Sequence, residues 1–335
     1  MAGASRAIGW ALIPLAIALF LAACGGGSGG GSVFEELLGT IPDTPETRQW
    51  VLINDYALGR ELFGVSLPGP DAGEEELLDY FSDLVSPANN PGLAEGPFIS
   101  GFTQYGMKQM DRARYLGFDL RNVDQSVQAG VPGGFLEVIR GRFDPEATER
   151  ALSACSECPA PDRQEHRGVN FYSWGMDNVG NLRLRLIPPA FDRVGRGGRI
   201  AVLGDYVFRT VETGGMRRLI DVSVGERRSL ADVEDFRLLA EGMSSLGAYT
   251  MLLSDQTQAL GDEEDMLAFF GGLASVGLEG LEAIKHEIEK AGLLRPYEAF
   301  ATGAGKDDDG PYMALVLVHD DAESAKANVG LLQQH

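Results

Sequence analysis

Cys155 and Cys158 form a C-x-x-C spacing, which redox enzymes and metal sites both use. In a redox enzyme such a pair begins a helix, where the helix dipole lowers the pKa of a thiol. Here the sequence predicts a helix from Pro145 to about Ala154, so the pair follows the helix end, where the dipole favours the neutral thiol. Zinc would need two further ligands, and His166 is the only histidine nearby in sequence. We expect a local disulfide outside the reducing cytosol, with redox chemistry and free thiols as the alternatives.

Three consecutive aspartates, Asp307, Asp308 and Asp309, lie in the sequence GAGKDDDG. Together with Asp320 and Asp321 they could offer oxygen ligands to calcium, which takes about 6 to 8 of them, but the spacing matches no EF-hand. A phosphate-binding loop also fits poorly, because an aspartate follows the lysine where serine or threonine is needed. We therefore expect a solvated acidic turn between two strands, and we predict neither a metal site nor a cofactor.

Tyr172 and Trp174 are candidates for ligand binding, because their rings would lie on one face of a strand and could line a groove with Trp50. A buried sheet face has the same pattern, and core packing is the favoured interpretation. His319 beside Asp320 could be half of a catalytic pair, but the sequence has no strand-to-helix G-x-S-x-G elbow to supply a nucleophile. We therefore predict no catalytic residues.

The N-terminal sequence indicates lipid attachment at Cys24. Residues 7–22 (AIGWALIPLAIALFLA) are an apolar run that follows a single cation, Arg6, and the run is shorter than the roughly 20 residues of a transmembrane helix. The tetrapeptide LAAC that ends at Cys24 resembles the bacterial lipobox, whose cysteine thiol carries diacylglycerol. We predict a signal peptide at residues 1–23 and an anchor in the bilayer through acylated Cys24; a plain membrane anchor is the alternative.

Residues 24–32 comprise this cysteine and the run GGGSGGGS. A chain of this composition behaves as a flexible coil, with a root-mean-square span of about 16 Å. We expect this tether to hold a folded domain clear of the lipid headgroups, at the extracytoplasmic face of the cell membrane.

The composition agrees with an exported globular domain. With 44% hydrophobic residues, the 335-residue chain has enough apolar side chains to build a core. The formal net charge of −21 excludes nucleic acid as a partner, because phosphate binding requires a basic surface.

The first region after the tether, residues 33–131, is predicted to be mainly helical. Thr44 and Pro45 form a typical helix start, and apolar residues then recur at helical spacing from Trp50 to Leu62. The pattern returns from Glu74 to Val85 behind an acidic first turn.

The second region, residues 132–260, is predicted to be an α+β unit. Residues 135–143 read as a strand, and Asp144 then caps the helix that begins at Pro145. Further strands are expected at 169–174, 182–187, 200–203 and 206–211. Gly204 and Asp205 form a two-residue hairpin turn, so neighbouring strands are antiparallel and the fold class is α+β.

The third region, residues 261–335, is predicted to be a second and incomplete α+β unit. A helix at 278–288 is followed by strands at 297–302 and 312–319 and by a final capped helix. Aligning residue 133 with residue 310 brings strand onto strand and capping aspartate onto capping aspartate, which predicts an internal duplication. Because nothing follows the final helix, we expect that the second unit is truncated.

Three phrases carry a resemblance to a protein family: LGFDLRNVDQSVQAG, FLEVIRGRFDPEATERAL and YMALVLVHDDAESAKANVGLL. With the lipobox and tether, they resemble uncharacterised exported bacterial lipoproteins built from duplicated α+β units, over most of residues 33–335. The resemblance implies location and architecture, and it supplies no catalytic residues. We expect a non-catalytic protein that binds a small ligand or an envelope partner. A solute-binding component of a transporter and a cell-envelope hydrolase are the alternatives.

The cysteine prediction can be tested directly. We expect Cys155 and Cys158 to be bonded to each other in protein purified from the cell envelope, and we expect their removal to cost little stability because the loop between them is very short. Mass spectrometry after alkylation without reductant checks this. Two freely alkylated cysteines in oxidised material would contradict it.

Overall fold

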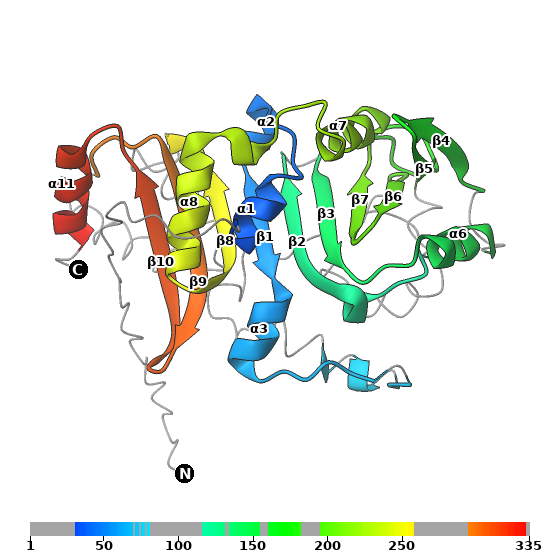
Figure 1. Ribbon diagram of the computed structural model, residues 1–335, viewed down its shortest axis with the longest axis horizontal. Coiled ribbons are helices and arrows are strands. Elements are labelled where there is room, and N and C mark those ends of the chain that lie inside the picture. Colours follow the sequence, from blue (N-terminus) through cyan, green and yellow to red (C-terminus); the bar gives the residue numbers. More distant parts are fainter. Residues whose placement is uncertain are drawn as a thin grey trace, which may run out of the picture.

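The computed structural model describes residues 31–69, 71–73, 75–77, 79–80, 116–130, 134–154, 160–181, 195–257 and 294–332. These residues build one antiparallel sheet of ten strands (Figure 1). Its order is β10 (Gly310–Val318), β9 (Ala299–Asp307), β8 (Ala248–Ser254), β1 (Val51–Asp55), β2 (Val123–Ala129), β3 (Leu136–Gly141), β7 (Tyr206–Thr210), β6 (Arg199–Leu203), β5 (Val169–Ser173) and β4 (Asp162–His166). The predicted α+β class with an antiparallel sheet is confirmed.

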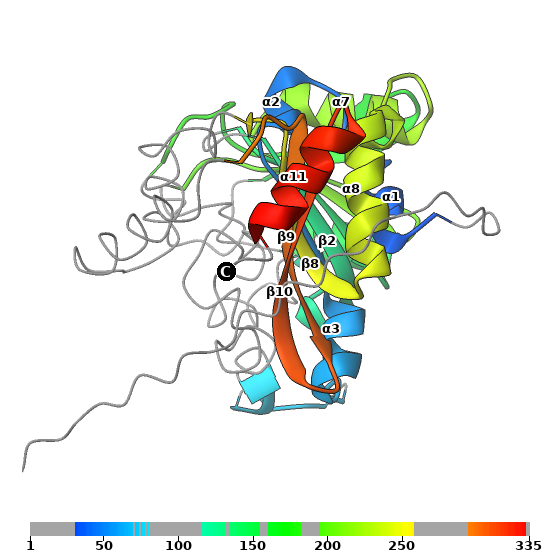
Figure 2. The same cartoon turned by 90° about the vertical axis from the view of Figure 1, so that its left-hand side faces the viewer.

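Helices flank this sheet. They are α1 (Val33–Leu38), α2 (Pro45–Arg48), α3 (Tyr56–Phe63), α6 (Pro145–Ala154), α7 (Thr213–Ser223), α8 (Glu234–Ser245) and α11 (Ala322–Leu332). Helices α1, α7 and α8 pack on one face, where their apolar side chains form the largest core with the central strands (Figures 1 and 2). Val138 of β3 belongs to this core, whereas its neighbour Ile139 points to the other face and packs with Leu152 of α6. We call that second face the α6 face.

The prediction of a continuous helix from Trp50 to Leu62 is wrong, because its first part forms strand β1. Val51, Leu52 and Ile53 are fully buried, and the strand pairs with β2 on one side and with β8 on the other. These two ladders decide the conformation, because a buried strand satisfies its backbone groups with both neighbours. The helix begins only at Tyr56, as α3. The described part of residues 33–131 therefore contributes two inner strands, β1 and β2, besides its helices.

The local predictions for residues 132–260 are confirmed where the structure describes them. The strand predicted at 135–143 is β3, and three of the short strands are β5, β6 and β7. Asp144 caps α6 by accepting the N–H of Glu146 at 2.9 Å. Gly204 turns the chain between β6 and β7 with a φ of 58°, which glycine adopts at no steric cost. The strand predicted at 182–187 and the helix predicted at 278–288 lie outside the described residues.

The hairpin of β9 and β10 is longer than predicted. The strand predicted at 312–319 is confirmed by β10, but the loop expected over 303–310 is wrong. Strand β9 continues to Asp307 and β10 starts at Gly310, so that only two residues separate them. A φ of 127° at Gly310 makes this tight turn possible.

The pattern of strand, aspartate and helix occurs twice, as predicted. Asp321 caps α11 by accepting the N–H groups of Glu323 and Ser324, both at 2.8 Å, as Asp144 does for α6. The two copies differ in the sheet: β3 pairs with β2 and β7, whereas β10 lies at the edge of the described sheet beside β9. Figure 1 shows α6 and α11 at opposite ends of the molecule. The repeated sequence pattern therefore does not extend to the surroundings of the two strands, and the internal duplication stays a prediction.

A buried ion pair crosses the centre of the sheet on the α6 face. Glu137 of β3 and Arg209 of β7 are cross-strand partners, and Nη1 of Arg209 lies 2.8 Å from Oε2 of Glu137. Their side chains are 0% and 5% exposed. Burial lowers the pKa of Arg209, and the carboxylate of Glu137 opposes that shift. Both charged groups are buried away from water, so removing one of them lowers the stability of the fold more than removing both.

This pair gives a prediction for stability. Glu137→Met should lower the free energy of unfolding by about 3–5 kcal/mol, because the Arg209 guanidinium then stays buried without this carboxylate. The double variant Glu137→Met/Arg209→Met should be more stable than the single variant. Urea unfolding measures both values, and a double variant that is less stable than the single one would contradict the account.

Candidate functional site

The candidate site lies where α3 leaves the end of β1. Asp55 is the last residue of the strand and also caps the helix, since its Oδ1 accepts the N–H of Leu58 at 3.0 Å. Helix α3 ends at Phe63, and Gly64 follows in the left-handed conformation with a φ of 67°. Such a glycine cap turns the chain away from the helix axis. The segment of residues 65–69 starts from this turn.

Arg121 holds the far end of that segment. Its Nη1 donates a hydrogen bond of 2.9 Å to the carbonyl oxygen of Gly69. Its Nε and Nη2 donate to the carboxylate of Asp119, with the shortest bond at 2.7 Å, and this hydrogen bonding raises the pKa of Arg121. The segment is therefore fixed at both ends.

Arg60 of α3 connects three parts of the chain behind the segment. Its Nη1 donates to the hydroxyl of Tyr80 at 3.2 Å and to the carbonyl of Val123 at 3.1 Å. Its Nη2 donates to Asp124 at 2.7 Å, and the Arg60 side chain is only 12% exposed. Tyr80 is buried, and this burial raises its pKa although the Arg60 charge opposes the shift. Arg60 thus forms an ion pair with Asp124, and Nη2 of Arg142 lies 3.6 Å from the same carboxylate oxygen.

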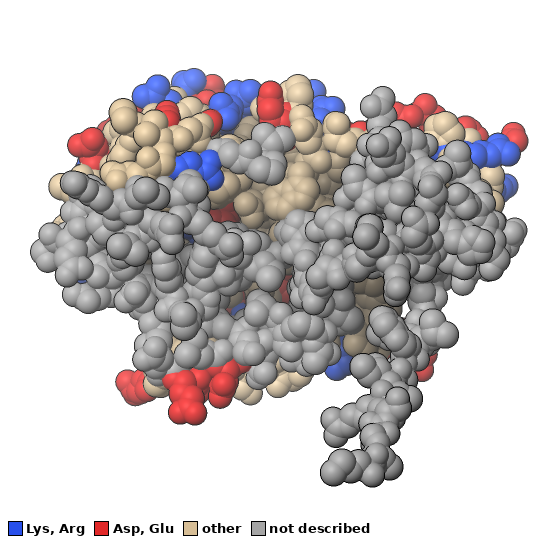
Figure 3. Space-filling view, turned by 180° about the vertical axis from the view of Figure 1, so that it is seen from behind, with Lys and Arg blue, Asp and Glu red and all other residues tan. Residues whose placement is uncertain are grey.

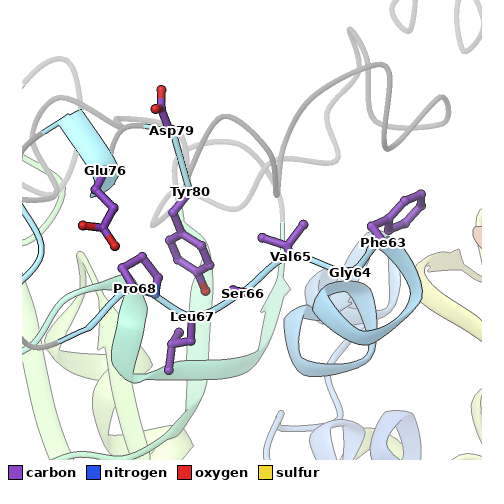
Figure 4. A pocket seen from close by; sticks show the side chains of 9 residues that line it. All are labelled: Phe63, Gly64, Val65, Ser66, Leu67, Pro68, Glu76, Asp79 and Tyr80. Carbon is purple, nitrogen blue, oxygen red and sulfur yellow. The ribbon is translucent and has the colours of Figure 1, made fainter.

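A pocket of about 360 Å³ lies between this segment and residues 76, 79 and 80, and we call it the Tyr80 pocket (Figure 4). Its lining is Phe63, Gly64, Val65, Ser66, Leu67, Pro68, Glu76, Asp79 and Tyr80. Figure 4 shows the ring of Tyr80 directed towards the segment, Glu76 turned towards Pro68, and Asp79 pointing outwards at the rim. Leu77, between the two carboxylates, is buried in the core of the α6 face. The described residues 75–77 and 79–80 are helical, as predicted for Glu74 to Val85.

The pocket is negatively charged. The carboxylates of Glu76 and Asp79 are exposed and make no hydrogen bond or ion pair within the described part of the chain. None of the nine lining residues is a lysine or arginine. Lys306 reaches the Phe63 end, where its Nζ donates to the carbonyl of Leu62 at 2.7 Å. Figure 3 shows acidic side chains gathered at the lower edge of the molecule. Carboxylates beside apolar walls can bind a cation that carries an apolar part.

The cysteine candidates lie outside the described residues. This holds for Cys24, Cys155 and Cys158, so lipidation and the disulfide stay predictions. Helix α6 ends at Ala154, directly before the first cysteine of the pair, as the sequence indicates.

The structure brings Tyr172 and Trp174 together in one core and places Trp50 elsewhere. Trp174 is 5% exposed and lies in the core of the α6 face, and Tyr172 packs against that same core. Burial raises the pKa of Tyr172. Trp50 packs against a different cluster, around Leu52.

The aspartates of the β9 and β10 hairpin form a turn. Oδ1 of Asp307 accepts the N–H groups of Asp309 and Gly310, at 2.9 and 3.1 Å. Asp320 and Asp321 lie beyond the other end of β10, whose nine residues span about 30 Å. The calcium alternative that joins these aspartates is therefore wrong. Within the described ranges, no group of three or more His, Cys, Asp or Glu could hold a metal ion.

The histidine candidates make structural contacts. His319 places Nδ1 3.0 Å from the carbonyl oxygen of Pro296, and its Nε2 faces Asn328 of α11. His166 contacts Asp221 of α7 at 2.7 Å.

The sequence predictions missed the Tyr80 pocket. Its lining comes from two segments, and Arg60, which joins them, lay in a stretch assigned to one long helix. A usable signal was present: Gly64 and the run P-G-P at residues 68–70 indicate a helix end and a turn.

Comparisons with known proteins add little. No family model and no curated protein matches the sequence. Among solved structures, the chain is similar to crystal form I of TP0453, with a TM-score of 0.38 and 11% identity. The alignment covers 89% of this chain and 86% of the other. That TM-score is too low for the likeness to carry an argument.

The cap at Gly64 gives a prediction. Gly64→Ala should lower the free energy of unfolding by about 1–2 kcal/mol, because a side chain disfavours the left-handed conformation. Gly69→Ala is the control: an added Cβ meets nothing within 4 Å at either glycine, and only Gly64 has a positive φ. Urea unfolding of both variants checks this. An equal decrease in the free energy of unfolding for both variants would contradict the claim that a side chain is strained at position 64.

Proposed function

We propose that this protein is a lipid-anchored extracytoplasmic binding protein without catalytic activity. Acylated Cys24 holds it at the outer face of the cell membrane, and the Tyr80 pocket receives a small ligand. The observation that carries the proposal is the N-cap of the first described helix at Ser32, which follows the glycine run in the sequence.

Ser32 is the N-cap of α1. Its Oγ accepts the N–H of Glu35 at 3.2 Å, and the helix that follows buries Phe34, Leu37 and Leu38 in the main core against α8. Ser32 therefore belongs to the fold, which shortens the tether predicted at residues 24–32 by one residue. The run of glycines between Cys24 and this cap has the composition of a flexible leash.

The charge of the domain supports a position away from the bilayer. The full chain has a net charge of −21, to which residues 1–31 contribute only the cation Arg6, and this charge repels the domain from anionic headgroups, so attachment requires an anchor at the end of a leash. Among the described residues, no helix is long and apolar enough to span a membrane.

The pocket supports binding. It combines exposed carboxylates with apolar walls, and its volume of about 360 Å³ is within the range of small-ligand sites. A solute-binding component of a transporter is less well supported, because those proteins have hinged lobes with parallel sheets, whereas this sheet is antiparallel.

The anchor gives the decisive experiment. Cys24→Ser should abolish incorporation of a labelled fatty acid and leave the precursor unprocessed, because the thiol is the acyl acceptor. Cys155→Ser is the matched control and should keep the label. Equal labelling of Cys24→Ser and the parent chain would contradict the proposal.

A further inference from the structure

We propose that the Tyr80 pocket binds a small organic cation, a short alkyl chain that carries one or two ammonium groups. This inference rests on the proposed binding function and names the class of ligand. It follows from the placement of the two carboxylates, from the apolar walls, from the pairing of Arg60 with Asp124 behind the pocket, and from the size of the pocket.

The carboxylates supply the attraction. Glu76 and Asp79 both line the pocket and are three residues apart in the sequence. Glu76 turns inwards towards Pro68 and Asp79 points outwards at the rim (Figure 4). One ammonium group can therefore reach the inner carboxylate while a second stays near the rim.

The walls supply the contact for an alkyl chain. Val65, Leu67 and Pro68 are apolar residues of the lining, and Leu67 is 42% exposed although its side chain is large and apolar. The ring of Tyr80 faces the same space, and an aromatic ring also attracts ammonium groups. An inorganic cation cannot use these walls.

The surrounding charges select against anions and metals. Arg60 lies behind Tyr80 and pairs with Asp124 at 2.7 Å, and Arg142 lies 3.6 Å from the same carboxylate oxygen, but neither arginine lines the pocket. Calcium requires about 6 to 8 oxygen ligands, and two carboxylates on an apolar surface do not supply them. The pocket is therefore suited to a cation with few charges and an apolar body.

The volume limits the ligand to a small molecule. About 360 Å³ lies near the lower end of the range for ligand pockets, which is roughly 300–1,000 Å³. A diamine with a six-carbon chain is a suitable probe, because it has both features and a neutral analogue of the same length exists.

Isothermal titration calorimetry on the full-length chain in a non-ionic detergent tests the inference. We expect 1,6-diaminohexane to bind, and 1,6-hexanediol and calcium chloride to show no binding under the same conditions. Binding of the diol as tight as that of the diamine would overturn the role of the carboxylates, and binding of calcium alone would overturn the class of ligand.

Two double variants, each of which removes two negative charges, test whether the diamine binds in the Tyr80 pocket. Glu76→Gln/Asp79→Asn should weaken diamine binding about fivefold or more, since each exposed ion pair contributes modestly. Asp71→Asn/Glu75→Gln removes two exposed acids of the same stretch that do not line the pocket, and it should change affinity less than about twofold. Equal losses in both variants would show that only the general negative field acts, and would overturn the inference.

The outcome is separable from that of the proposed function. Fatty-acid labelling that depends on Cys24, together with no diamine binding, would overturn this ligand class and leave the anchored location supported. Diamine binding with labelling that does not depend on Cys24 would support the pocket and overturn the anchor.

Discussion

Strand β1 hydrogen-bonds to two strands that are far from it in sequence, and the whole sheet depends on this double pairing. Residues 51–55 pair with residues 125–129 of β2 and, on the other side, residues 51–54 pair with residues 250–253 of β8. Within the described sheet, β8, β9 and β10 join the other strands only through β1. Contacts across some 200 residues are costly in chain entropy, and the burial of Val51, Leu52 and Ile53 helps to offset that cost.

The same strand positions the candidate site. The chain passes directly from β1 into α3 and from α3 through Gly64 into the wall of the Tyr80 pocket. Asp55 strengthens this passage, because its Oδ1 accepts the N–H of Leu58 and lies 3.2 Å from Nε2 of Gln125 on β2. Arg60 then fastens α3 to Tyr80 and to the start of β2. The pocket is a surface feature whose walls are connected to a strand that is buried along its whole length.

Much of the fold was predictable where local chemistry decides it. Asp144 before proline, the Gly204 turn and Asp321 at α11 act within a few residues, so the sequence pattern and the structure agree. Strand β1 was assigned to a helix because apolar residues from Trp50 to Leu62 recur at helical spacing. Its conformation is decided by distant partners, which no window of sequence contains. Strand β2 was missed because VDQSVQA carries polar residues, such as Ser126 and Gln128, on its less apolar face.

The site was less predictable than the fold, because it depends even more on contacts between segments that are distant in sequence. The Tyr80 pocket arises from contacts between segments, such as Arg60 with Asp124, that have no local signature. Strand β1 holds together a rigid core from which the ligand pocket projects. Hydrogen exchange of the full-length chain, with and without 1,6-diaminohexane, tests it most directly. We expect the β1 amides to exchange slowest in both states and the ligand to protect only residues 64–69 and 75–80. Fast exchange in β1, or ligand protection centred on the β9 and β10 hairpin, would contradict it.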